Sequence, residues 1–190
     1  MPDIKDQKLL YHLTSIRNIG SILKSGLKPR AQLNKFEDVA DSEILRKRKV
    51  LGLENYVPFH WFSRNPFDGG VQAARTDEYF LLVTVRRALA KAQNWKVIPR
   101  HPLAKEDIKV MDYQEGFDAI DWAIMNQRAY HDTRCKSVCM AECLSPDPVP
   151  ASSFFRIYVP NEEVERFVSE KIRSLNLVLE VDVSRGMFLN

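Results

Sequence analysis

The 190-residue sequence lacks the glycine-rich signatures of two common nucleotide-binding folds, GxGxxG and the P-loop. It also lacks the Gly-x-Ser-x-Gly turn of a hydrolase nucleophile, and its four histidines do not have metal-ligand spacing. These absences exclude Rossmann-type and P-loop binding, and we expect no metal. Any nucleotide must therefore be held by a different arrangement.

Long apolar runs and cysteines are also scarce. No apolar run approaches transmembrane length, and the first residues do not resemble a signal peptide, so we expect a cytoplasmic protein without membrane contact. Three cysteines without a CxxC motif favour a reduced environment over a disulfide scaffold. The net charge of +3 and pI near 8.7 permit a nucleic-acid partner but do not require one.

A hydrophobic content of 45% in a chain of this length predicts one globular domain over residues 1–190. Strand patterns outnumber helix patterns and do not form βαβ units, which favours an α+β fold with mostly antiparallel pairing. The expected strands cover residues 10–14, 56–62, 80–85, 95–98, 108–111, 137–144, 154–159 and 177–183. The expected helices cover residues 16–23, 42–50, 69–74, 117–125 and 162–175.

Glu142 is the most informative single residue, because it interrupts an otherwise apolar strand-like run. In a strand, Met140, Glu142 and Leu144 share one face, while Cys139, Ala141 and Cys143 share the other. The second face is small and apolar and is expected to face the core, which directs Glu142 toward a cleft. A carboxylate there would offset the positive charge that develops on a ribose as a glycosidic bond breaks. The alternative is an edge-strand carboxylate that points to water.

Cys135, Cys139 and Cys143 are spaced four residues apart and allow two interpretations. On a helix they would form a stripe of thiols, and a zinc or iron–sulfur site would be conceivable. On a strand, Cys139 and Cys143 would lie about 13 Å apart, too far to share one metal. The surrounding residues favour the strand, so we expect small core residues rather than ligands.

Three further elements carry groups that suit a nucleotide. His12 and Thr14 end the first strand at a strand-to-helix corner, where the imidazole could fix a ribose hydroxyl. The basic run 46–49 matches pyrophosphate oxygens, although such a run is ordinarily a solvated face. The aromatic run 56–62 is mostly core, with one or two rings suited to lining a flat pocket for nicotinamide or a base.

Taken in order, these motifs resemble the DarT family of bacterial toxins, which ADP-ribosylate a base of single-stranded DNA with NAD+. The motifs that carry the resemblance are Tyr11-His12-Leu13-Thr14, Ser21 to Leu27, the basic helix, Tyr56-Val57-Pro58-Phe59, Ser63-Arg64-Asn65-Pro66 and Ala141-Glu142. Together they extend over most of the chain up to about Pro150. The resemblance implies the split β-sheet of ADP-ribosyltransferases with peripheral helices, and NAD+ as co-substrate.

The resemblance also assigns roles to particular residues. It makes Glu142 the catalytic glutamate, with Arg48, or Arg46 as second choice, as the catalytic arginine on an element over residues 35–53 that folds over NAD+. Residues 111–142 would present the acceptor base. The expected NAD+ contacts are His12, Leu13, Thr14, Ser21, Lys28 and Arg48, and the rings expected to stack on bases include Tyr113, Trp122 and Tyr130.

This chain departs from the family at Cys139-Met140, where arginine and glutamine are usual, and at His60, where tyrosine or phenylalanine is usual. These departures leave the target base open between thymidine and guanosine. A single-stranded acceptor is expected because a base nitrogen used in pairing is inaccessible in a duplex. The expected partner is a macrodomain antitoxin with ADP-ribosyl hydrolase activity. The alternatives are transfer to RNA or protein, and a non-catalytic nucleotide-binding or nucleic-acid-binding module.

Overall fold

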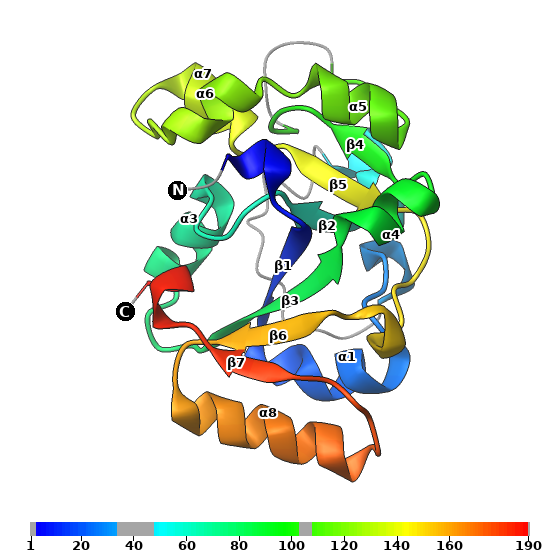
Figure 1. Cartoon of the computed structure of the whole chain (residues 1–190), viewed down its shortest axis with the longest axis vertical. Helices are drawn as coiled ribbons and strands as arrows, with labels where there is room; N and C mark the ends of the chain where they lie inside the picture. The colour runs from blue at the N-terminus through cyan, green and yellow to red at the C-terminus, as the bar shows by residue number, and fades with distance from the viewer. Residues whose placement is uncertain (1–2, 34–47, 103–107, 190) are drawn as a thin grey trace.

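The computed structural model describes residues 3–33, 48–102 and 108–189, which form a seven-stranded sheet covered by helices (Figure 1). The strands are β1 Leu9–Ser15, β2 Val57–His60, β3 Phe80–Arg86, β4 Lys96–Ile98, β5 Glu142–Ser145, β6 Arg156–Val159 and β7 Val181–Val183. The sheet order is β4-β5-β2-β1-β3-β6-β7, and every described neighbour pair is antiparallel except β6 and β7. The expected α+β class with mostly antiparallel pairing is confirmed.

The helices lie between the strands in sequence and are mostly short. The α-helices described in full are α1 Ile19–Ser25, α3 Pro66–Ala74, α4 Arg87–Ala92, α5 Tyr113–Ala119, α6 Trp122–Gln127, α7 Thr133–Val138 and α8 Glu162–Ser174. Single 3-10 turns are η1 Ile4–Asp6, η2 Ile16–Asn18, η3 Arg30–Gln32, η4 Leu53–Asn55, η5 Ala151–Ser153 and η6 Arg185–Met187. No helix in the described ranges is long and apolar enough to cross a bilayer.

The opening strand and helix form as the sequence predicts. The alternation of β1 places its apolar side chains on both faces of the sheet, and α1 buries Ile19, Ile22 and Leu23. Gly26 ends α1 with φ +78°, and a Cβ there would lie 2.5 Å from the carbonyl oxygen of Val149. Glycine is therefore required at this position, where the chain crosses the segment that follows β5.

The sheet is split between β1 and β2. The two strands share a single paired position, Tyr11 with His60, whereas β1 pairs with β3 from Leu9 to Ser15. Beyond Tyr11 the backbones of β1 and β2 diverge, so the polar end of β1 faces the start of β2 without ladder hydrogen bonds. This opening gives backbone and side-chain groups access to a ligand in the middle of the sheet.

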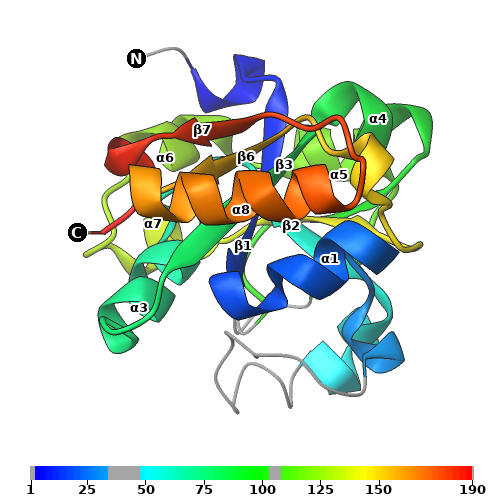
Figure 2. The same cartoon turned by 90° about the horizontal axis from the view of Figure 1, so that it is seen from below.

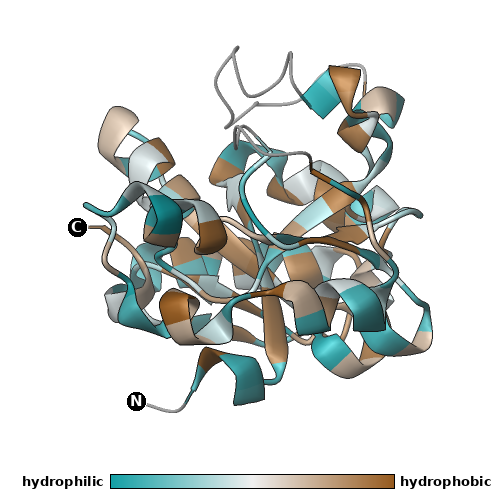
Figure 3. Cartoon of the chain, turned by 90° about the horizontal axis from the view of Figure 1, so that it is seen from above, coloured by the Kyte–Doolittle hydropathy of each residue, from teal (hydrophilic) through white to brown (hydrophobic). Residues whose placement is uncertain are grey.

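The two faces of the sheet are buried against different elements. One face packs against α1, α8 and the α5–α7 region in a large apolar cluster, and α1 and α8 lie side by side (Figures 1 and 2). The other face packs against α3 and the C-terminal segment through a smaller cluster that includes Tyr11, Leu13, Val71 and Phe188. The central strands are accordingly mostly apolar, whereas the outer helices mix both kinds of residue (Figure 3).

The C-terminal helix confirms its sequence pattern, with one exception. Asn161 caps α8 by accepting a hydrogen bond from the N–H of Val164 at 3.0 Å. Phe167, expected in the core, is 42% exposed, because the buried stripe consists of Val164, Val168 and Ile172 and Phe167 lies beside it. The last strand is shorter than expected and starts only at Val181.

Other boundaries also differ from the expectations. The expected helix 117–125 is two helices, because Ile120 has extended backbone and Asp121 caps α6. The expected strand 108–111 is a single bridge between Met111 and Val97. The helix expected to begin at Gly69 begins at Pro66, since Asn65 accepts hydrogen bonds from two N–H groups of its first turn.

The strand expected over 137–144 is wrong in its first half. Cys135 lies in α7 and Cys139 caps its C-terminus, and their Sγ atoms are 4.0 Å apart; only Cys143 lies on a strand. All three thiols are free and buried, as expected of core residues. In the described ranges, no group of three or more His, Cys, Asp or Glu side chains is placed to hold a metal.

Asp68, in the first turn of α3, is a buried carboxyl group that destabilises the fold when it is charged. It is 1% exposed, and neither carboxylate oxygen has a hydrogen-bond partner of good geometry among the described residues. Burial raises the pKa of Asp68 to about 7, and the nearby polar groups of Asn65 and Arg64 offset this only in part. Between pH 3.8 and 7 the folded state therefore binds more protons than the unfolded state, and the contribution of Asp68 to stability falls as pH rises.

We expect Asp68→Asn to raise the free energy of unfolding by up to about 4 kcal/mol at pH 8, because the amide carries no charge to bury. Near pH 4 the gain disappears, since Asp68 is then protonated in the fold. Urea unfolding at pH 4 and pH 8 measures both values, with the exposed Asp77→Asn as the matched control. An equal effect of Asp68→Asn at both pH values would contradict a buried, protonated carboxyl group.

Candidate active site

Glu142 and Arg48 form a buried ion pair at the centre of the candidate site. Nη1 of Arg48 lies 2.6 Å from both Oε1 and Oε2 of Glu142, and the two residues are 8% and 6% exposed. Glu142 starts β5, which lies between β4 and β2, so the edge-strand alternative is wrong. Glu142 and Leu144 face away from the large apolar cluster that contains Cys143, as the alternation predicts.

Arg48 comes from a segment that is described only in part. Residues 48–50 are helical, consistent with the expected basic helix 42–50, whereas Arg46 and the rest of residues 34–47 lie outside the described residues. Lys49 and Val50 are exposed, so Arg48 alone of these three residues points inward. Because a buried guanidinium needs a partner, the pair with Glu142 holds residues 48–50 over the start of β5.

His12 lies next to this pair, on the β1 side of the split. Its Nδ1 is 2.8 Å from the carbonyl oxygen of Pro58 on β2. A carbonyl oxygen only accepts, so Nδ1 donates and Nε2 is left as an acceptor. Desolvation lowers the pKa of His12, and the charges of Arg48 and Glu142 act on it in opposite directions. The imidazole is therefore a neutral bridge across the two diverging strands.

His60 is a site residue that the sequence analysis noted only as a departure from the family. It pairs directly with Glu142 across β2 and β5, and its ring stacks on Phe67 with centroids 5.3 Å apart. Its Nδ1 is buried and has no hydrogen-bond partner among the described residues. Burial lowers the pKa of His60 to about 4, so the ring is neutral beside the carboxylate at neutral pH. Its strand position opposite Glu142 was the signal that could have identified it.

The remaining expected NAD+ contacts lie on β1, on α1 and in the segment after α1. Leu13 is buried in the smaller apolar cluster, so only its backbone can reach a ligand. Thr14 is buried, and its Oγ1 accepts from Nδ2 of Asn18 at 3.3 Å. Ser21 is exposed on α1, with its hydroxyl donating to the carbonyl oxygen of Asn18 at 2.9 Å, and Lys28 is half-buried beyond α1. Thr14 therefore lies at the end of β1, whereas Ser21 and Lys28 lie farther along the chain, on α1 and after it.

A second guanidinium lies near Arg48. Desolvation lowers the pKa of Arg30, in η3, and the charge of Arg48 lowers it further, while Glu54 opposes the shift. Two arginines close to a carboxylate and a polar strand end match the needs of a ligand that carries a pyrophosphate and two ribose groups. The sequence analysis missed Arg30, because it lies outside the basic run.

The aromatic residues expected to stack on bases occupy different environments. Tyr113 and Trp122 are 4% and 8% exposed and pack with Trp61 and Phe117 in the large apolar cluster. Their burial argues against stacking on a base. Tyr130 is half-buried near the end of the chain segment that leads to Glu142, and its hydroxyl donates to the carbonyl oxygen of Arg64 at 3.0 Å.

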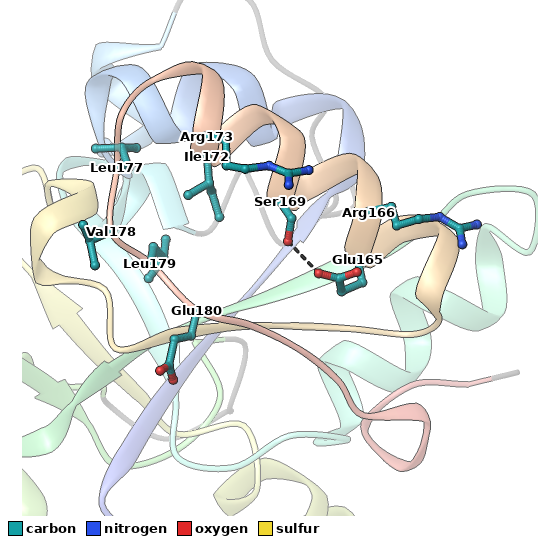
Figure 4. Close-up of a pocket in the computed structure, with 9 residues that line it drawn as sticks. All are labelled: Glu165, Arg166, Ser169, Ile172, Arg173, Leu177, Val178, Leu179 and Glu180. Atoms are coloured by element: carbon teal, nitrogen blue, oxygen red, sulfur yellow. Dashed lines mark hydrogen bonds between the residues drawn. The ribbon is translucent and has the colours of Figure 1, made fainter.

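A groove of about 580 Å³ lies elsewhere, between α8 and the segment before β7 (Figure 4). It is lined by Arg166, Arg173 and the apolar residues 177–179, and Glu165 and Ser169 are hydrogen-bonded within it. Four strands separate β7 from β5 in the sheet order, so this groove is distinct from the Glu142 site.

Comparison with known proteins agrees with this geometry. The family model described as "ssDNA thymidine ADP-ribosyltransferase, DarT" matches residues 11–189. No curated protein matches the sequence. The structure of Thermus sp. 2.9 DarT in complex with ADP-ribosylated ssDNA is similar with a TM-score of 0.81 and 20% identity, over 95% of this chain and 96% of that one.

Two further solved structures show the same fold. Thermus sp. 2.9 DarT in complex with NAD+ has a TM-score of 0.77 and 18% identity, over 97% of this chain and 98% of that one. Thermosipho africanus DarTG in complex with ADP-ribose has a TM-score of 0.74 and 22% identity, over 96% of this chain but 51% of that one. The family match extends over nearly the whole sequence, and the fold is that of the solved DarT structures. The chain belongs to the DarT family of ssDNA thymidine ADP-ribosyltransferases.

Proposed function

We propose that this chain transfers ADP-ribose from NAD+ to thymine in single-stranded DNA, with Glu142 as the catalytic carboxylate. The observation that carries the proposal is the buried Arg48–Glu142 pair at the split of the sheet, bordered by the neutral rings of His12 and His60. The family description and the Thermus complexes with NAD+ and with ADP-ribosylated ssDNA support the substrates.

The polar groups around the split suit NAD+. The acceptor Nε2 of His12 and the polar end of β1 with Thr14 would hold ribose hydroxyl groups, while Ser21 and Lys28 would contact the ligand along its rim. Arg48 and Arg30 supply positive charge for the pyrophosphate. One Nη1 atom of Arg48 engages both oxygens of Glu142, and each oxygen keeps a further acceptor position for the bound ligand.

In the proposed reaction, the bond between nicotinamide and ribose breaks and nicotinamide leaves with the bonding electrons. One oxygen of Glu142 hydrogen-bonds the ribose and offsets the positive charge that develops on it. Thymine has one ring nitrogen outside its glycosidic bond, and this nitrogen forms the new bond to the anomeric carbon. Its proton passes to the carboxylate of Glu142 as the bond forms. Arg48 orients the carboxylate through their ion pair.

The single-stranded acceptor follows from the same chemistry. The reacting nitrogen of thymine is used in base pairing, and extruding a paired base costs a few kcal/mol. We further propose a cytoplasmic toxin that is countered by a macrodomain with ADP-ribosyl hydrolase activity. The three free cysteines fit a reduced environment, and this chain spans only 51% of the Thermosipho africanus DarTG chain.

Transfer from labelled NAD+ to short oligonucleotides tests the proposal. We expect label on single strands that contain thymine, and none on thymine-free strands or on the same sequence in a duplex. Label on guanine would retain the mechanism and change the target base, while label only on RNA or protein would contradict the acceptor. NAD+ binding without transfer to any acceptor would point to a non-catalytic module.

A further inference from the structure

A cationic surface lies where the segment after β2 meets the segment before β5. These two strands carry His60 and Glu142, which pair across the sheet. After β2 the chain continues through Phe62 to Arg64, and the chain that precedes β5 includes the turn between α6 and α7 with Arg128 and Tyr130. The Tyr130 hydroxyl donates to the carbonyl oxygen of Arg64 at 3.0 Å, and the guanidinium of Arg128 lies over the Phe62 ring, 4.9 Å from its centroid. These two contacts hold the two segments together.

The two arginines on this surface are available to a ligand. Arg64 is exposed and Arg128 is half-buried, and neither forms an ion pair with a carboxylate in the part of the chain that the structure describes. The side-chain hydrogen bond of Arg64 is a long one, 3.4 Å to the carbonyl oxygen of Gly186. By contrast Arg134, close by on α7, is paired with Asp121 at 3.4 Å.

Position and charge together indicate the ligand. Arg64 lies four positions after His60, and this stretch spans at most about 14 Å of extended chain, so the surface lies near the His60–Glu142 pair. Two arginines without acidic partners, beside the half-buried ring of Tyr130, are typical of surfaces that bind the backbone of single-stranded nucleic acid. The carboxylates of an acidic protein segment would also pair with these arginines. We favour DNA, because the proposed acceptor already places phosphates next to the site.

We propose that Arg64 and Arg128 form a phosphate-binding subsite for the DNA strand next to the acceptor base, with Tyr130 as the positioning residue that joins the two segments. This subsite rests on the proposed function and adds to it the residues that hold the flanking backbone. The guanidinium groups contact phosphate oxygens, which fixes the register of the strand and carries no base specificity.

The test measures binding of a thymine-containing single strand to the full chain by fluorescence anisotropy, between 50 and 200 mM salt. For the double variant Arg64→Gln/Arg128→Gln we expect at least about tenfold weaker binding at low salt. The slope of log K against log salt should become shallower by about 1.4, because each phosphate contact in a single strand contributes about 0.7. NAD+ binding should be unchanged, since these arginines lie outside the NAD+ site.

Matched variants separate charge from folding. Arg64→Lys/Arg128→Lys keeps the charges and should retain most of the slope, and Arg134→Gln, which removes a nearby but ion-paired arginine, should leave the slope unchanged. An unchanged slope and affinity in the Gln double variant, with a wild-type melting temperature, would overturn the subsite. Absence of ADP-ribosyl transfer by the wild-type chain would instead refute the proposed function, and the salt slope would still decide the subsite.

Discussion

Glu142→Gln is expected to lower ADP-ribosyl transfer by about 10³-fold or more, because the amide neither offsets positive charge on the ribose nor accepts a proton. NAD+ binding should change much less, because the contacts of His12 and Thr14 remain in place. Single-turnover transfer from labelled NAD+ to a thymine-containing strand measures the rate, and calorimetry measures NAD+ binding. A variant that keeps the wild-type rate would refute the assigned role.

The choice of glutamine follows from the ion pair. Alanine would leave Arg48 buried without a partner, which costs about 3–5 kcal/mol in typical cases, so loss of activity could reflect loss of stability. Glutamine keeps an oxygen that accepts from Nη1 of Arg48. Glu180→Gln is the control, because Glu180 is also ion-paired, with Arg156, but lies just before β7, which four strands separate from β5. Its transfer rate should stay close to wild type.

The sequence predicted the parts of the site that depend on local pattern. The β1–α1 unit with its glycine stop and the inward and outward alternation around Glu142 follow from motifs a few residues long. The Arg48–Glu142 contact joins residues 94 positions apart, and it could be expected only from the family resemblance. The roles of both residues stay predictions until the variants are measured.

The helix and strand boundaries that were predicted wrongly have local causes in the sequence. Asp132 accepts a hydrogen bond from the N–H of Cys135, three residues later, and so begins a helix in a segment that was expected to be a loop and then a strand. A capping residue at this spacing outweighs the strand preference of Val138. The helix brings Cys135 and Cys139 together, where the strand would have separated them.

Burial of aromatic residues could not be derived from spacing. Tyr113, Trp122 and Tyr130 occur in one segment and were expected to act together on the acceptor base. Trp61 lies just after β2, some fifty residues away from Tyr113. Its ring packs against Tyr113 and Trp122 in the core, with ring centroids 6.2 and 5.3 Å apart. Such non-local packing decides which aromatic residue remains at the surface, and here it leaves Tyr130.

Arg87→Met is expected to have the largest effect on stability. The guanidinium of Arg87 is buried and donates to four carbonyl oxygens, those of Ile4, Lys5, Leu9 and Trp61, at 2.7 to 3.1 Å. Burial lowers the pKa of Arg87 only to about 10, so the group is charged at neutral pH. Hydrogen bonds to a charged group contribute about 1.5–3 kcal/mol each, and several are lost together. We expect destabilisation by about 4 kcal/mol, a fall in Tm of about 10 °C.

The same residue connects stability to the site. Arg87 binds the carbonyl of Leu9 on β1 and that of Trp61 just after β2, so it holds the two strands together at the closed end of the split, next to the Tyr11–His60 pair. Arg87→Met should therefore reduce transfer even at temperatures where the variant is folded, whereas Arg86→Met, which removes the exposed neighbour, should change neither property. Thermal melts and transfer assays at 20 °C measure both. A folded Arg87→Met variant with wild-type transfer would show that the split holds its geometry without this clamp.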